Sequence, residues 1–425
     1  MKFFQPKIIE TLKHYDKKQF VSDLVAGIIV AIIALPLSIA LAIASGVGPE
    51  RGLYTAIVAG FVIALLGGSR VNISGPTAAF ATIVAGIVAT EGLDGLVIAT
   101  MLAGLILVIF GLCRLGSLIK YIPHAITVGF TGGIAVTIVV GQLKDFFGIT
   151  PAPGTNAVET AEKVEMLIES APTFNLAAFL VGAVALVVLI VWQRFIKKIP
   201  GSLVVVLIGA LVVALLPKSI EVNTIGDLFK ISSSLPKPVF PALSWERVLH
   251  LLPDAFTIAL LAAIESLLSC VVSDGMIDDR HDSNTELIAQ GCGNICSGLF
   301  GGIPATGAIA RTAANVKNGG RSPISGIVHA LVLLLVLLVL MPYASWIPMP
   351  IIAAVLLVVA YNMSEWRSFV KIFRARSVVD ILALVVTFVL TVVFNLVVAI
   401  VAGMVLYYLL HLILALTKKK RSENA

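Results

Sequence analysis

One acidic residue, Glu265, lies deep within a long apolar segment, TIALLAAIESLLSCVVSD. Asp254 lies 11 residues before it and Asp274 lies 9 residues after it. At about 1.5 Å per helical residue, its carboxyl group falls near the middle of a bilayer. A charge there costs at least about 2.5–3.5 kcal/mol, so a carboxyl group retained at that depth usually has a function. Glu265 is therefore predicted to exchange a proton or bind a cation, with Ser269 on the same helix face. The alternative is a structural carboxyl group hydrogen-bonded within the bundle.

A second candidate is the stretch GGIPATGAIARTAANVKNGG, residues 301–320, which lies between two strongly apolar blocks. Irregular backbone survives in a membrane core only where it lines a cavity or is buried in protein. Pro304 and Gly307 discourage an early helix, and a short helix is predicted over 312–316. Such a half-helix directs the positive end of its dipole and unpaired N–H groups at whatever lies beyond, which favours an anion. Arg311, at the start of this helix, would add a fixed positive charge.

Arg311 has two bland alternatives. Its side chain could extend to the membrane interface, or it could pair structurally with Glu265. If the two residues pair, anion binding and protonation of Glu265 become electrostatically linked.

The stretch VNISGPTAAF, residues 71–80, has the same character early in the chain. Ser74, Thr77 and the N–H groups that follow Pro76 could bind an anion. Thr77 could instead only cap its own helix, and Phe80 could pack in the core. We interpret the protein as two half-helices that face one another across an anion site.

The composition indicates a polytopic membrane protein. The chain has 425 residues, of which 59% are hydrophobic and 13% are charged, whereas a soluble domain has about 25% charged residues. The net charge of +6 comes from short loops and termini, so no nucleic acid partner is expected. No HExxH, GxSxG, Walker or cysteine–histidine metal pattern occurs, so neither an enzyme, a cofactor nor a metal site is predicted.

The segments that must position these residues are all expected to be helices. Several are shorter than the roughly 20 residues of a straight span, and the third and tenth are read as half-helices that follow extended stretches. The domains are a cytoplasmic lead-in over 1–23, a transport domain over 24–416 and a basic cytoplasmic tail over 417–425. About fourteen segments are predicted, at 24–44, 52–67, 76–92, 95–112, 122–142, 174–195, 201–216, 252–272, 285–300, 311–317, 323–345, 349–362, 378–394 and 396–416.

Breaks at matching distances indicate an internal repeat. Pro76 and Pro304 are 228 positions apart, and Pro123 and Pro348 are 225 apart. With Pro36 matched to the neighbourhood of Glu265, the chain divides near 24–200 and 201–416 into two repeats of seven segments. An odd number inverts the second repeat, as in many transporters. Basic loops after the even-numbered segments put both termini in the cytoplasm of a cell inner (plasma) membrane protein.

The run LPLSIALAIASGVGPERGLYTAIVAGFVIALLGGSRVNISGPTAAF resembles the first three segments of SulP-type anion transporters, the sulfate permease family. The resemblance continues through IESLLSC around Glu265 and through GGIPATGAIART. It implies fourteen segments in a seven-plus-seven inverted repeat, divided between a core and a scaffold. It also implies an anion between the third and tenth half-helices, and a homodimer whose cores move like elevators.

Carried over by position, the resemblance assigns the anion site and the coupling residues. Glu265 takes the place of the acidic coupling residue. A hydroxyl expected near Ile309 is missing, which favours protons over sodium, and Leu37 replaces a common glutamine. The STAS domain typical of the family is not expected within this chain. The site residues are Thr77, Ala78, Ala79 and Phe80 on the third helix, Gly307, Ala308, Ile309 and Arg311 on the tenth, and Glu265 and Ser269 for proton coupling.

The predicted function is proton-coupled symport of a small anion such as sulfate, bicarbonate or a dicarboxylate. Sodium-coupled bicarbonate symport, uncoupled anion exchange and a channel-like conductance stay open as alternatives. A nucleobase–proton symporter shares the general fold but would not explain Arg311. A non-transporting sensor or partner protein would leave both buried charged residues unexplained.

Overall fold

The computed structural model describes residues 4–152, 155, 157, 159–196, 200–215, 221–394 and 396–423. The protein is predominantly helical, as the composition predicts, with one two-stranded sheet in this part of the chain. The α-helices are α1 (Lys7–Thr11), α2 (Lys17–Ala44), α3 (Pro49–Leu66), α4 (Ala81–Leu112), α5 (His124–Phe146), α6 (Thr160–Glu169), α7 (Leu176–Phe195), α8 (Gly201–Leu215), α9 (Ile225–Leu228), α10 (Trp245–Ile277), α11 (Ser283–Leu299), α12 (Ile309–Lys317), α13 (Pro323–Leu340), α14 (Met349–Met363), α15 (Trp366–Ala375), α16 (Val378–Val393) and α17 (Leu396–Glu423).

Short elements connect these helices. The strands β1 (Ser74–Gly75) and β2 (Thr306–Gly307) come from distant parts of the chain and pair with one another. The 3₁₀ helices are η1 (Leu12–His14), η2 (Ala78–Phe80), η3 (Leu115–Tyr121), η4 (Ala171–Thr173) and η5 (Met341–Trp346).

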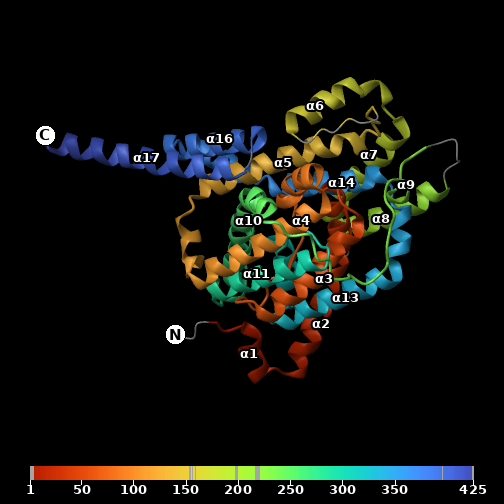
Figure 1. The fold of residues 1–425 in the computed structure, drawn as a ribbon, viewed down its shortest axis with the longest axis horizontal. Coiled ribbons are helices and arrows are strands. Elements are labelled where there is room, and N and C mark those ends of the chain that lie inside the picture. The colour runs from red at the N-terminus through yellow and green to blue at the C-terminus, as the bar shows by residue number, and fades with distance from the viewer. Residues whose placement is uncertain are drawn as a thin grey trace.

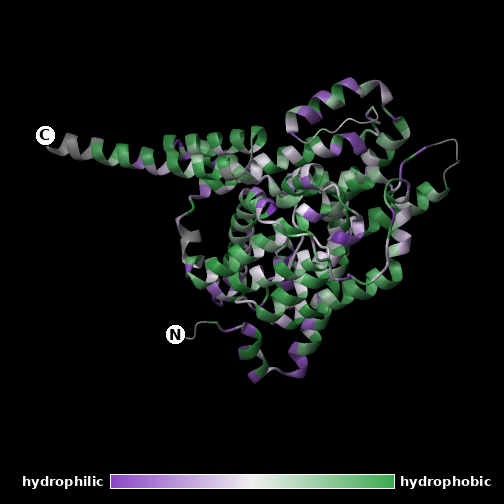
Figure 2. Ribbon diagram, viewed as in Figure 1, coloured by the Kyte–Doolittle hydropathy of each residue, from purple (hydrophilic) through white to green (hydrophobic). Residues whose placement is uncertain are grey.

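Eight helical stretches in the described residues are long and apolar enough to cross a bilayer, and three shorter apolar helices accompany them. Apolar residues cover most of these helices, whereas polar residues gather on α1 and α6 (Figure 2). The eight stretches are Lys17–Ala44, Pro49–Leu66, Ala78–Leu112, His124–Phe146, Trp245–Ile277, Pro323–Trp346, Met349–Ala375 and Val398–Leu416.

The helices pack in two groups. One contains α2, α3, α4, α10, α11, α12 and α13, and the other contains α5, α7, α14, α16 and α17. The last helix extends far from the rest of the molecule to the C-terminus, with α16 alongside its first part (Figure 1). The strand pair lies within the first group, where β1 contacts α3 and β2 contacts α10.

Three local features bear on the predicted segments. The boundary expected between 76–92 and 95–112 coincides with Gly92, whose non-helical φ of 69° and ψ of −168° divide α4 into two helices at a kink; glycine takes this left-handed conformation without steric cost. Pro36 lies inside α2 without ending it, because proline removes one hydrogen bond but need not stop a long helix packed on neighbours. In the connection before α10, Thr224 forms an isolated bridge with Pro348.

Polar residues begin several of these helices. Asp282 precedes α11 and accepts hydrogen bonds from the N–H groups of Asn284 and Thr285, while Asp16 caps α2 in the same way through Gln19. These caps satisfy donors that have no partner within the helix. They fix where the helices around the strand pair begin.

Candidate anion-binding site

The two extended stretches lie side by side. Ser74 pairs with Gly307 and Gly75 with Thr306 in antiparallel register, and the N–H of Ala308 donates to the carbonyl of Ile73 at 2.9 Å. Each strand then leads into a helix, β1 into η2 and α4, and β2 into α12. The helix starts that the sequence singles out are therefore neighbours.

Asn72 ties the first stretch to three other elements. Its Nδ2 donates to Glu286 Oε1 at 2.8 Å, and its Oδ1 accepts from Ser269 Oγ at 2.8 Å and Thr312 Oγ1 at 3.0 Å. Thr312 Oγ1 in turn accepts from the N–H of Ile73 at 3.0 Å. Backbone that cannot pair within a helix is thus satisfied by buried side chains, as the absence of water in a bilayer requires.

Glu286 on α11 is a buried carboxylate, 1% exposed, that organises the same region. Five donors converge on it, which compensates for the cost of removing its charge from water. Its donors are the N–H groups of Gly68 and Ser69 at 3.0 and 3.3 Å, Asn72 Nδ2 at 2.8 Å, Ser266 Oγ at 3.1 Å and Gln290 Nε2 at 2.9 Å.

Asn294 and Thr55 hold the second stretch. The Asn294 amide brackets Ala305, donating to its carbonyl at 2.9 Å and accepting from its N–H at 2.8 Å. Thr55 Oγ1 accepts from the N–H of Ile303 at 2.7 Å. Asn294 thus joins α11 to the extended backbone before β2, which has no helical partner of its own.

Glu265 lies next to the start of the first stretch's helix. Its Oε2 accepts a hydrogen bond of 2.9 Å from Thr77 Oγ1, and its side chain is partly exposed. Ser269, expected to act with Glu265, is fully buried, and its hydroxyl lies within hydrogen-bonding distance of Asn72 and Thr312. The helix face was predicted, but Ser269 contacts the network that positions the strands.

Arg311 is buried, 3% exposed. Its Nη2 donates to the carbonyl of Pro76 at 3.0 Å, while Nη1 has no hydrogen-bond partner among the described residues. A Cβ atom at Gly75 would come within 2.7 Å of Nη1, so glycine allows the guanidinium to approach the strand. None of the ion pairs in the described residues joins Arg311 to Glu265, so this positive charge is not neutralised by that carboxyl group.

The other predicted site residues differ in how deeply they are buried. Phe80 is fully buried and packs in the main hydrophobic cluster, as do Ala78 and Ala79. Gly307 is buried within the strand pair and Ala308 is partly exposed. Ile309, in the first turn of α12, is 40% exposed, so this side chain is not packed in the core.

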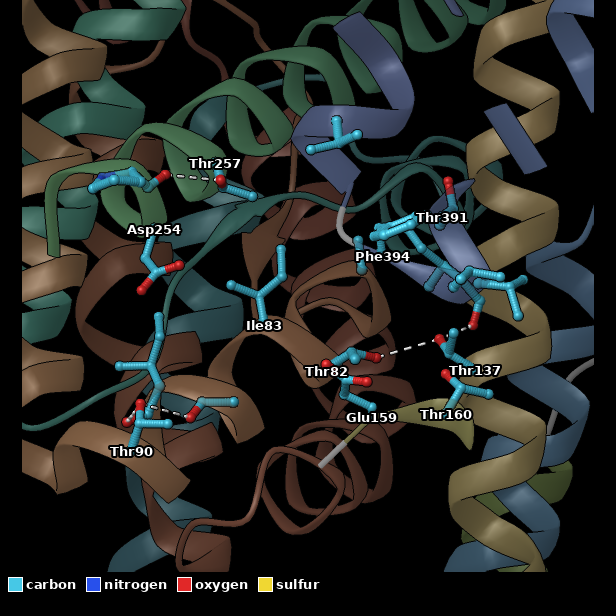
Figure 3. A pocket seen from close by; sticks show the side chains of 18 of the residues that line it. Thr82, Ile83, Thr90, Thr137, Glu159, Thr160, Asp254, Thr257, Thr391 and Phe394 are labelled. Carbon is cyan, nitrogen blue, oxygen red and sulfur yellow. Dashed lines mark hydrogen bonds between the residues drawn. The ribbon is translucent and has the colours of Figure 1, made fainter. Parts of the chain in front are cut away.

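A cavity of about 1050 Å³ reaches Ala79 between α4 and α10 on one side and α5 and α16 on the other. Its lining is mainly apolar but includes six threonines, and the start of α6 contributes Glu159, Thr160 and Glu162. Thr82 and Thr137 point toward one another from α4 and α5, with their oxygens 3.3 Å apart (Figure 3). The cavity therefore lies between the two groups of helices and reaches η2, where the third predicted segment begins.

A family model gives the affiliation: residues 20–387 match the model of the sulfate permease family. The chain belongs to this family. The putative sulfate transporter YvdB of Bacillus subtilis is 46% identical over 385 residues, which cover 89% of this chain and 71% of YvdB. The bicarbonate transporter BicA of Picosynechococcus sp. is 35% identical over 361 residues, which cover 82% of this chain and 62% of BicA.

Solved structures agree with that assignment. The transmembrane domain of a cyanobacterium bicarbonate transporter BicA superposes with a TM-score of 0.81 at 30% identity, covering 92% of this chain and 98% of that domain. This sulfate permease family member is thus a membrane protein with the fold of a transporter domain, as the motifs predict. It spans about two thirds of the length of the two relatives.

Sequence reasoning missed the residues that hold the strands in place. Asn72, Thr312 and Glu286 were not singled out, although each contacts the predicted stretches. Glu286 was predictable, because an acidic residue in the predicted ninth segment, 285–300, carries the same cost of burying a charge as Glu265. Asn72 and Thr312 carried none, since isolated polar residues in irregular stretches are common.

Proposed function

We propose that this sulfate permease family member is a secondary active transporter that carries a small anion together with a proton. The observation that carries the proposal is the hydrogen bond from Thr77 to Glu265 beside the paired helix starts. It joins a candidate anion site to a candidate proton carrier within one contact. Binding of the anion would therefore change the proton affinity of Glu265, and protonation of Glu265 would change the affinity for the anion.

The anion would be held where η2–α4 and α12 begin. The first turn of every helix has N–H groups without intrahelical partners, and the dipole adds positive potential there. Arg311 supports this role because no acidic residue pairs with it and Nη1 has no hydrogen-bond partner in the described chain. Thr77, Ala78, Ala79, Phe80, Gly307, Ala308 and Ile309 would form the surroundings of the anion.

The proton would be carried by Glu265. Among the described residues it has a single hydrogen-bond donor, Thr77, whereas Glu286 on α11 has five. A carboxylate with few donors in a poorly hydrated site gains most from protonation. Ser269 would act only indirectly, by fixing Asn72 and the stretch that leads through β1 to Thr77.

The transport domain would cross the membrane about fourteen times, in two inverted repeats near 24–200 and 201–416. The eight long helices, three shorter ones and the broken segments around β1 and β2 support this arrangement. Both termini would lie in the cytoplasm, with the protein in the plasma membrane as a homodimer. The cavity between the two helix groups supports an elevator-like movement of the group that contains the site.

Several anions suit such a site, because helix starts and arginine recognise negative charge and oxygen atoms. Sulfate and bicarbonate are the first candidates, since the relatives YvdB and BicA are named as sulfate and bicarbonate transporters. Dicarboxylates come next. Sodium-coupled bicarbonate symport or uncoupled exchange is the second candidate function, and the likeness to BicA supports bicarbonate as its anion.

The test is uptake of radiolabelled sulfate and bicarbonate into proteoliposomes under an imposed proton gradient, an imposed sodium gradient or neither. Proton-coupled symport predicts accumulation above equilibrium when the outside is acidic, with or without sodium. Accumulation that requires sodium, or only exchange against internal anion, would replace the proposal by its alternative.

A further inference from the structure

Helix α15 has an apolar face and a basic flank that nothing in the proposed transport cycle uses. Trp366, Phe369, Val370 and Phe373 follow the i, i+3, i+4, i+7 spacing of a single helix face, and α15 has no buried residue. Phe369 stacks on Phe373 with ring centroids 5.4 Å apart. The helix therefore lies on the surface of the bundle, where it contacts α5 and α16.

An apolar hollow of about 430 Å³ runs beside this face. Helices α5, α14, α15 and α16 form its walls, which are almost entirely hydrocarbon. Its lining includes Val136, Leu357, Tyr361, Phe369, Val370 and Phe388.

A second hollow, of about 560 Å³, continues from the first. It is lined by Phe369, Val370, Phe373, Arg374 and Arg376. Phe369 and Val370 line both hollows, so the hollows are neighbours along α15, and we treat them together as one groove. This groove, called the α15 groove below, is apolar along most of its length and ends at two arginines.

The basic flank of α15 has no counterion in the described chain. No ion pair or side-chain hydrogen bond of the described residues involves Arg367, Lys371, Arg374 or Arg376. Residues 365–376 contain these four basic residues and one acidic residue, Glu365. Arginine matches phosphate with paired N–H donors. The free charge at the end of the α15 groove therefore suits a phosphate group.

Aromatic residues place this groove at a membrane surface. Trp366 Nε1 donates to the hydroxyl of Tyr361 at 3.1 Å, and both side chains are exposed. Tryptophan and tyrosine are enriched where hydrocarbon meets headgroups, and a basic amphipathic helix attracts anionic lipids. A molecule that has both a hydrocarbon chain and a phosphate group would match the apolar part of the groove and its basic end.

We propose that the α15 groove binds an anionic phospholipid, with an acyl chain against Val136 and Phe388 and the headgroup phosphate at Arg374 and Arg376. A zwitterionic lipid offers the same chain but no net charge. A free phosphate ester offers the charge but no chain. The groove thus selects for both features together.

The experiment measures lipid binding to the purified full chain in detergent by native mass spectrometry, with the melting temperature as a second readout. The probes are dioleoyl phosphatidylglycerol, dioleoyl phosphatidylcholine, dihexanoyl phosphatidylglycerol and glycerol phosphate. The variants are Arg374→Gln with Arg376→Gln, and Val136→Trp, which fills the apolar end at a 36% exposed position. Arg194→Gln is the matched control, an exposed basic residue in the last turn of α7.

Dioleoyl phosphatidylglycerol is expected to bind more tightly than the other three probes. A surface Lys or Arg contributes roughly fivefold to anionic lipid binding, so the double arginine variant should weaken it roughly 25-fold and Arg194→Gln should not. Val136→Trp should weaken both dioleoyl lipids alike. Equal binding of phosphatidylcholine and phosphatidylglycerol, or unchanged selectivity in the double arginine variant, would overturn the proposal.

Discussion

The Thr77 hydroxyl donates a 2.9 Å hydrogen bond to Glu265 Oε2, joining the start of the third helical segment to the middle of α10. A threonine hydroxyl can donate to a carboxylate and can turn to accept from a protonated carboxyl group. The same contact can therefore persist in both protonation states of Glu265. Changes around it separate anion binding from proton coupling.

Replacing Thr77 with valine should keep the volume of the side chain and remove the donor. A hydrogen bond to a charged group contributes about 1.5–3 kcal/mol, so proton-driven uptake should fall about 10- to 100-fold. Thr77→Ser is the matched control and should retain most activity because it keeps the hydroxyl. The rates are measured in proteoliposomes, and equal rates for valine and threonine would remove Thr77 from the mechanism.

Arg311→Gln should weaken anion binding by at least tenfold, since a buried positive charge disappears from the two helix starts. The measurement is isothermal titration with sulfate and with bicarbonate. Gly75→Ala tests the same point from the other side, because the added Cβ would come within 2.7 Å of Nη1 and displace the guanidinium. Unchanged affinity in both variants would show that Arg311 acts only through its bond to Pro76.

Asn294→Ala should destabilise the fold rather than alter selectivity. It leaves the buried N–H and carbonyl of Ala305 unpaired, at about 1–3 kcal/mol for each unsatisfied group. Asn318→Ala is the control, because its amide bonds the carbonyl of Ala314 at an exposed site. Thermal unfolding in detergent should show a clear loss for Asn294→Ala alone; equal melting temperatures would contradict the role of Asn294 as a support of β2.

Alkaline pH should loosen the N-terminal segment through Tyr15. Its hydroxyl donates to Asp23 Oδ2 at 2.8 Å, and burial, with the Asp23 carboxylate nearby, raises the pKa of Tyr15 above its ordinary value. The folded state thus favours the neutral phenol, and this stabilisation is present below about pH 10 and lost as the pH rises further. From about pH 8 to about pH 11, the wild type should lose more melting temperature than Tyr15→Phe, with Tyr343→Phe as the control. Parallel losses in both would exclude this group.

Composition and the positions of helix-interrupting prolines and glycines predicted much of the fold, because the bilayer restricts which backbone structures can cross it. Few charges and long apolar runs require helices, and Pro76, Pro304 and Gly307 mark backbone that cannot continue one. The sequence placed the two broken stretches in different halves of the chain. Their pairing follows from the expectation that half-helices meet, but the register Ser74 to Gly307 does not.

The hydrogen-bond partners of individual side chains could not be predicted from the sequence, for a physical reason. Spacing places Ser269 on the same helix face as Glu265, yet its hydroxyl belongs to the network around Asn72. Helical periodicity gives direction around an axis, whereas a hydrogen bond depends on which neighbouring element lies there. At Gly92 no such partner was needed, and the boundary expected between 76–92 and 95–112 coincides with the non-helical backbone that divides α4.

The most direct measurement is concentrative anion uptake by Glu265→Gln in proteoliposomes with an acidic exterior. Glutamine keeps the shape and can still accept the hydroxyl of Thr77, but it cannot release a proton. Anion binding and exchange should persist in this variant, while accumulation above equilibrium should be abolished. Full proton-driven accumulation by this variant would contradict the central claim.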